Sequence, residues 1–251
     1  MSVPFERSAG LGVHHGFFGR AGGMSQGEFA GANMSTSVGD DPEAVAANRR
    51  SAADALGFSS GLQLLKQVHS ADVLALTEPL SQPGTIAADA LVTDRPGLLL
   101  AILTADCTPI LLADQEAGVI GAAHAGWRGA VDGVVGNTVA AMRKLGADPA
   151  RVVAAIGPTI TQPNYEVGEQ FRADFLALHP AGERFFTTPP GKRAHFDLPG
   201  FVEDQLRRAG VGTIERVGGC TYAHPDRYFS HRYATHQGTR TGRQVSVIGL
   251  T

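Results

Sequence analysis

The chain has 251 residues, and 43% of them are hydrophobic, which is enough apolar material for a substantial core. It carries 21 Lys and Arg against 24 Asp and Glu, so the net charge of −3 does not favour nucleic-acid binding by electrostatic attraction. No apolar run approaches the ~20 residues of a membrane span, and the first residues lack the charged-then-apolar order of a signal peptide. We therefore expect a cytoplasmic protein that binds neither nucleic acid nor a membrane.

Strand-like and helix-like patterns alternate along the chain without a regular repeat. Short strands joined by turns are predicted over 13–38, and two strands are predicted within 62–76, joined through 67–72. Further strands are predicted over 89–94, 98–106 and 151–158, in a hairpin around "QEA", and in "TIERVGGCTY" and "QVSVIGL". Helices are predicted over 40–57, 129–149, 168–179 and 198–211. The Pro- and Gly-rich segment 180–194 is expected to be a loop.

Three residues that could carry chemistry end or follow apolar runs. They are His69 in "KQVHSAD", Cys107 in "TADCTPI" and His124 in "AAHAGWRG". One thiolate and two imidazoles form a zinc donor set, and three protein ligands leave a fourth position open, as in catalytic sites. The spacings of 38 and 17 residues match no short-range zinc motif, so the residues alone also fit a buried free cysteine with two hydrogen-bonded histidines.

The same atoms support a second hypothesis that needs no metal. Cys107 could be a nucleophile, with His124 or His69 as its base, because a nearby imidazolium lowers the pKa of a thiol. Both hypotheses require a cysteine and a histidine in contact. The sequence alone leaves the choice between them open.

Four other residues are candidates for the surroundings of this site. Asp89 could be a general acid or base, or could orient a histidine. Arg128, near a predicted helix start, suits an oxyanion or phosphate, and Arg49, in "ANRRSA", could be only a helix-face charge. His14, in the turn-rich first segment, could face a pocket. A cationic stretch, "YFSHRYATHQGTRTGR", is predicted to be the polar edge of the last strand, either facing substrate or exposed.

A set of motifs in order along the chain resembles one family. The motifs are "HGFFGRAGG", "KQVHSADV", "ADALVTD", "LTADCTPILLAD", "GAAHAGWRG", "IGPTITQPNYEVG" and "TGRQVSVI". They are similar to those of the multicopper polyphenol oxidoreductase (laccase domain) family, now described as zinc-dependent purine nucleoside phosphorylases. The resemblance runs from about His14 to the end of the sequence and predicts one domain over 1–251. Two departures are Thr159, where members often have cysteine, and a longer spacing before "TGR".

The resemblance implies a fold, a site and an activity. The fold is α+β, layered α/β/β/α with two mixed sheets. The histidine of "QVHS", the cysteine of "TADC" and the histidine of "HAGWRG" bind zinc, and they correspond here to His69, Cys107 and His124. The activities implied are phosphorolysis of adenosine, inosine and S-methyl-5′-thioadenosine, with deamination of adenosine, so purine nucleosides and phosphate are the expected partners.

Three alternatives remain at this stage. The first is a Cys–His hydrolase acting on an amide of a cell-wall precursor, because the resemblance also reaches a factor linked to peptidoglycan editing. The second is a copper-dependent polyphenol oxidase. A multicopper enzyme needs several copper centres, whereas the sequence yields one three-ligand cluster. The third is a metal-binding module without catalysis.

Overall fold

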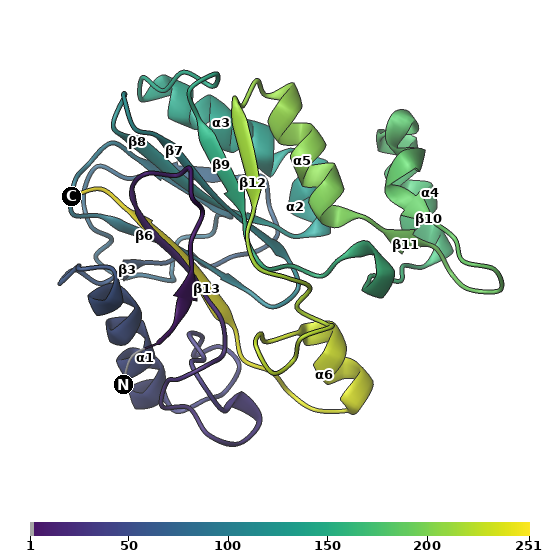
Figure 1. The fold of residues 1–251 in the computed structure, drawn as a ribbon, viewed down its shortest axis with the longest axis horizontal. Helices are drawn as coiled ribbons and strands as arrows, with labels where there is room; N and C mark the ends of the chain where they lie inside the picture. Colours follow the sequence, from purple (N-terminus) through teal and green to yellow (C-terminus); the bar gives the residue numbers. More distant parts are fainter. Residues whose placement is uncertain (1–2) are drawn as a thin grey trace.

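Apolar side chains alternate between the two faces of the central strands, so one sheet can pack on both sides. The computed structural model describes residues 3–251. In β7 (Thr108–Asp114), Ile110 and Leu112 pack toward a layer of helices, while Leu111 and Ala113 pack toward a second sheet. The same division of apolar residues in neighbouring strands produces two stacked sheets between helical layers (Figure 1).

The two large sheets are both mixed. The five-stranded sheet has the order β1 (Phe5–Glu6), β2 (His14–Phe18), β13 (Gln244–Gly249), β6 (Leu99–Thr104) and β3 (Leu62–Gln63). The six-stranded sheet has the order β12 (Thr213–Arg216), β9 (Val153–Ile156), β7, β8 (Val119–Ala125), β5 (Ala90–Thr93) and β4 (Val73–Ala75). In each sheet most neighbours are antiparallel, and β3–β6, β4–β5 and β9–β12 are parallel.

Helices cover the two outer faces. Helix α1 (Pro42–Ala55) packs on the five-stranded sheet, and α2 (Trp127–Asp132), α3 (Val134–Lys144) and α5 (Leu198–Arg208) pack on the six-stranded one. The predicted α/β/β/α layering is thereby confirmed. The remaining helical and strand elements are η1 (Gly27–Phe29), η2 (Gln162–Asn164), α4 (Glu169–Leu178), η3 (Pro180–Phe185), β10 (Phe186–Thr187), β11 (His195–Phe196) and α6 (His231–Gln237). Helix α4 and the β10–β11 pair lie to one side of the stacked sheets (Figure 1).

Three segment predictions need correction. The helix expected over 129–149 is two helices, because Gly133 adopts a left-handed φ of 99° and ends α2 before α3 begins. The loop expected over 180–194 contains η3 and β10. The cationic stretch before the last strand contains α6, where the Ser230 side chain accepts from the amide of Tyr233 and Gly238 ends the helix at φ 67°.

Two connections between the sheets meet at one end of the stack. The turn from β6 to β7 passes from the five-stranded to the six-stranded sheet, and so does the segment from β3 to β4. The first connection carries Cys107, and the second carries His69. Within residues 3–251, no helix is both long and apolar enough to cross a membrane.

Candidate metal centre and active site

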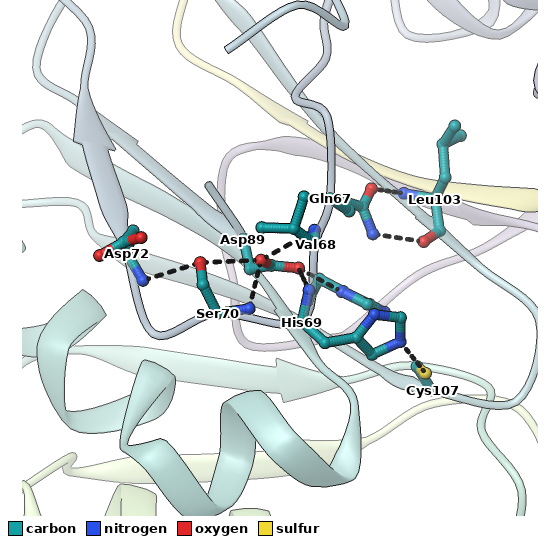
Figure 2. A network of polar contacts seen from close by, with 9 residues as sticks. Gln67, Val68, His69, Ser70, Asp72, Asp89, Leu103 and Cys107 are labelled. Atoms are coloured by element: carbon teal, nitrogen blue, oxygen red, sulfur yellow. Dashed lines mark hydrogen bonds and ion pairs between the residues drawn. The ribbon is translucent and has the colours of Figure 1, made fainter. Parts of the chain in front are cut away.

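A single buried carboxylate organises the segment that carries His69. Asp89 is 0% exposed, and its Oδ2 accepts hydrogen bonds from the amides of Val68 (3.1 Å) and Ser70 (2.7 Å) and from the Ser70 hydroxyl (3.0 Å). Its Oδ1 accepts from the amide of His69 (3.0 Å; Figure 2). The same oxygen lies 2.8 Å from Nδ1 of His124. The chain wraps around this anion, and His69 takes a left-handed φ of 62° to do so.

The structure brings together the three residues that the sequence singled out. Nε2 of His69 lies 3.7 Å from Sγ of Cys107, and the donor atoms of His69, Cys107 and His124 all lie within 4.8 Å of one another. A tetrahedral zinc ion with its usual bond lengths holds a sulfur and a nitrogen donor about 3.5 Å apart. Because Nδ1 of His124 faces Asp89, its Nε2 is the nitrogen available to an ion. The donor set therefore fits a four-coordinate metal with one position open.

Two glycines in "HAGWRG" give the site its room. A Cβ at Gly126 would lie 2.4 Å from Cδ2 of His69 and 3.2 Å from Sγ of Cys107. A Cβ at Gly129 would lie 2.7 Å from the carbonyl oxygen of Ser70. The start of α2 can pack directly on the His69 segment only because both positions lack a side chain.

Neighbouring charges shift the pKa of each buried group in this cluster. Burial raises the pKa of the Cys107 thiol, but His124 and His69 lower it by more, to about 6. Burial lowers the pKa of His124, and the nearby Cys107 and Asp89 raise it above its ordinary value. Burial raises the pKa of Asp89, and its hydrogen bonds from His124 and the backbone amides bring it below the usual carboxyl range. The cluster thus favours a thiolate, which is the form that binds metal or attacks a substrate.

The donor atoms open onto a cavity of about 670 Å³. This volume lies in the range of small-molecule sites. Besides the three donor residues, the cavity is lined by Arg49, Arg243, Lys66, Gln67, His231, residues 35–37, residues 64–65, residues 83–84 and residues 103–105. The lining combines cationic and hydroxyl groups with apolar side chains, which suits a polar ligand that also has an apolar face.

Among the other predicted site residues, Arg49 and Asp89 belong to the site, whereas the structure does not bring Arg128 or His14 to it. Arg128 is exposed, and its guanidinium carbon lies 5.0 Å from the centroid of the Trp127 ring, outside the cavity lining. His14 pairs with Gly249, which in turn pairs with Leu99, at the opposite end of β6 from the Cys107 turn. The length of β6 separates the two ends by about 16 Å.

Sequence reasoning did not consider residues 35–37, and it included His231 and Arg243 only as parts of the cationic stretch that either faces substrate or is exposed. All of these residues line the cavity. Arg243 precedes β13, which runs antiparallel to β6, so the start of one strand lies beside the end of the other. The "TGR" motif was the available signal. It pointed to a shared sequence pattern and not to a position in space.

The fold and this donor cluster define a class of protein that comparison with known families identifies. Residues 14–251 match the family described as "Multi-copper polyphenol oxidoreductase laccase", and the chain belongs to that family. A protein of Deinococcus radiodurans named purine nucleoside phosphorylase is 46% identical over 249 residues, covering 99% of this chain and 93% of that protein. A purine nucleoside phosphorylase of Streptomyces coelicolor, SCO2081, is 42% identical and covers 98% of both chains.

A solved structure shows the same fold. The crystal structure of the Neisseria meningitidis protein NMB0706 superposes with a TM-score of 0.85 at 35% identity, covering 100% of this chain and 98% of that one. YlmD from Geobacillus stearothermophilus superposes with a TM-score of 0.82 at 30% identity, covering 99% of both chains. The family expected from the sequence motifs is confirmed.

Proposed function

We propose that this chain is a zinc-dependent purine nucleoside phosphorylase. It uses phosphate to cleave adenosine, inosine and S-methyl-5′-thioadenosine to the free base and (methylthio)ribose 1-phosphate, and it also deaminates adenosine. The observation that carries the proposal is the convergence of one thiolate and two imidazoles within 4.8 Å at a cavity large enough for a nucleoside. The names of the relatives support the activity.

The residues that would hold zinc are His69, Cys107 and His124. When bound, zinc supplies positive charge that stabilises an oxyanion and lowers the pKa of water, which is chemistry that deamination uses. The family's description names copper, but a multicopper oxidase needs several copper centres. Residues 3–251 contain one group of three or more His, Cys, Asp or Glu side chains with converging donor atoms, and this favours a single zinc ion.

The protein's own residues then orient the reactants. Asp89 fixes the tautomer of His124 and holds the His69 segment. Arg49, whose side chain lines the cavity, supplies positive charge for phosphate. In phosphorolysis, a phosphate oxygen bonds to C1′ of the ribose while the C1′–N9 bond breaks. The electron pair of the broken bond leaves with the purine, and the purine takes up the proton that the attacking phosphate releases.

Metal dependence tests this proposal directly. The protein is stripped with a chelator, dialysed and assayed for ribose 1-phosphate from inosine and for ammonia from adenosine. We expect both products to disappear with the metal and to return when one equivalent of zinc is restored. Full activity in the metal-free protein, or restoration by copper and not by zinc, would contradict the proposal.

A second candidate, a Cys–His hydrolase acting on an amide of a cell-wall precursor, is favoured by one observation. The pKa of Cys107 is lowered by two neighbouring imidazoles, as in thiol hydrolases. This function predicts activity without stoichiometric metal and an acyl-thioester on Cys107. Mass spectrometry of the protein after incubation with a peptidoglycan precursor distinguishes the two functions.

A further inference from the structure

Two arginines on separate elements face the same cavity without an acidic partner. Arg49 comes from α1, and Arg243 precedes β13. Among the residues that the structure describes, no ion pair involves either guanidinium group. Most partly buried arginines offset their charge against a carboxylate. Two uncompensated cations at one cavity therefore indicate a site for an anion.

The side chain of Arg49 and the backbone of Arg243 both bond to Met34. Nε of Arg49 donates to the carbonyl oxygen of Met34 at 2.8 Å, and the amide of Met34 donates to the carbonyl oxygen of Arg243 at 2.9 Å. Nη1 of Arg243 donates to the carbonyl oxygens of Gly242 (2.9 Å) and Thr241 (3.2 Å). These neutral acceptors hold the guanidinium groups in place without neutralising them. Within residues 3–251, both terminal nitrogens of Arg49 and Nη2 of Arg243 have no hydrogen-bond partner.

The electrostatic surroundings agree with this geometry. Burial lowers the pKa of Arg49. Burial also lowers the pKa of Arg243, and the more distant charges of Cys107 and Asp106 offset only part of that effect. The Asp106 carboxylate already accepts from the Thr221 hydroxyl and the Arg232 amide at 2.6 Å each. It is therefore engaged in holding the Cys107 turn and does not form an ion pair with Arg243.

Hydroxyl groups line the cavity next to these cations. Ser35 directly follows Met34, Ser37 lies two residues further on, and the Oγ atoms of the two serines lie 2.9 Å apart. Oδ1 of Asn33 accepts from the amides of both Ser35 (3.1 Å) and Arg243 (2.8 Å), so one side chain fixes the hydroxyl segment relative to the arginine. Two fixed guanidinium groups beside two hydroxyls match the donors that a tetrahedral oxyanion requires.

We propose that Arg49, Arg243, Ser35 and Ser37 form a binding site for orthophosphate. The inference rests on the proposed function, in which this anion is the co-substrate, and it adds Arg243 and the two serines to Arg49. Arg128, which lies outside the cavity, has no part in the site. The phosphate is bound in the same cavity as the three donor residues, which places it within reach of a nucleoside held there.

Binding of orthophosphate to the zinc-loaded protein, without nucleoside, tests the site. Isothermal titration calorimetry is run on the wild type, Arg243→Gln, Arg243→Lys and the control Arg50→Gln. Arg50 is the next residue on α1 and is exposed outside the cavity. We expect Arg243→Gln to weaken phosphate binding by about 10- to 100-fold, since a charge-assisted hydrogen-bond pair is lost. Arg243→Lys keeps the positive charge but loses the paired N–H donors of the guanidinium group, so its phosphate affinity should lie between those of the wild type and Arg243→Gln. Arg50→Gln should bind phosphate like the wild type.

Steady-state kinetics give a second readout that a general loss of structure would not produce. Arg243→Gln should raise KM for phosphate by a similar factor and leave KM for inosine and the zinc content within about twofold of wild type. Unchanged phosphate binding in Arg243→Gln would overturn the inference even if phosphorolysis is confirmed. Phosphate binding that depends on Arg243 in a protein without phosphorolysis would support the site and refute the proposed function.

A nucleotide is the other source of the same chemical group. The calorimetry is therefore repeated with AMP in place of orthophosphate. If AMP shows the binding that depends on Arg243 and orthophosphate shows none, the cavity accepts a nucleotide phosphoryl group, and the proposed orthophosphate site is refuted.

Discussion

Asp89 and His124 are linked twice across neighbouring strands. The amide of His124 donates to the carbonyl oxygen of Asp89 at 2.8 Å, and Nδ1 of its ring lies 2.8 Å from the Asp89 carboxylate. The same carboxylate accepts from the amide of His69. One buried residue therefore fixes both the backbone position of His124, through its carbonyl oxygen, and the ring orientation of His124, through its carboxylate, which also holds the segment that carries His69.

We predict that Asp89→Asn weakens zinc binding by about 10- to 100-fold, the usual cost of losing the partner of a metal-binding histidine. The NH₂ group of asparagine would face at least one N–H group that now donates to the carboxylate, so that hydrogen bond would be lost. A competition titration with a chromogenic chelator measures the affinity. Asp72→Asn is the matched control, because the Asp72 side chain is exposed and only the backbone of Asp72 contacts this network, through its amide and through its carbonyl oxygen, which accepts from the amide of Asp89. Equal affinities in the two variants would contradict the positioning role of Asp89.

The lowered pKa of Cys107 predicts rapid alkylation of the metal-free protein. The thiolate form is present above the folded pKa of about 6, so the iodoacetamide rate should rise through pH 6 and level off by pH 8. An ordinary thiol still gains reactivity toward pH 9. Cys220, which is buried at 9% exposure, remains as the internal reference in Cys107→Ser. Zinc should protect Cys107, and a rate that zinc leaves unchanged would show that this sulfur is not a ligand.

How much the sequence could predict differs between the metal cluster and its surroundings. Side chains such as Cys107 and His124 that interrupt apolar runs were recognisable as residues at or near strand ends, and the family motifs grouped them with His69. The sequence did not show which strand ends lie next to one another across the sheets. His14 begins β2, and that end of the strand lies away from the site, because β2 and β13 are antiparallel. Arg243 lies at the site for the same topological reason, since β13 and β6 are antiparallel.

Local backbone geometry was the other limit on prediction. The run over 129–149 has good helical periodicity, but the left-handed conformation of Gly133 divides it into α2 and α3. Neither periodicity nor composition distinguishes a glycine inside a helix from one that ends a helix. The break matters for the site, because the short α2 begins three residues after His124 and places Gly126, its N-cap, and Gly129 against the His69 segment.

A buried carboxylate far from the site, Asp114, pairs with the exposed Arg151 and should control stability in acid. Burial raises the pKa of Asp114, but Arg151 and the amides of Asp148 and Ala117 lower it by more, so the folded value lies below the ordinary 3.8. The stabilisation is fully present above pH 3.8 and is lost as the pH falls through the lower folded value. Asp114→Asn should unfold more easily at neutral pH, by about 1–3 kcal/mol, and its stability should depend less on pH below 3.8.

Urea unfolding at several pH values measures both effects. Glu116→Gln is the matched control, because that side chain is 77% exposed and contacts the same Arg151 at 3.4 Å. It should unfold like the wild type at every pH. If Asp114→Asn and wild type lose stability in parallel below pH 3.8, a different carboxylate carries the acid transition.

Alanine should lower zinc affinity at Gly126, the N-cap of α2, but raise stability without changing zinc affinity at Gly136, inside α3. In Gly126→Ala the new Cβ would meet Cδ2 of His69 at 2.4 Å, so His69 must move away from Cys107, and zinc affinity should fall at least tenfold. In Gly136→Ala, inside α3, the Cβ meets nothing within 4 Å, and the unfolding free energy should rise by about 0.5–1 kcal/mol with unchanged zinc affinity. Thermal unfolding and zinc competition, measured on both variants, separate packing at the metal centre from helix stability. Wild-type zinc affinity in Gly126→Ala would mean that His69 moves without cost, and would argue against a rigid three-ligand centre.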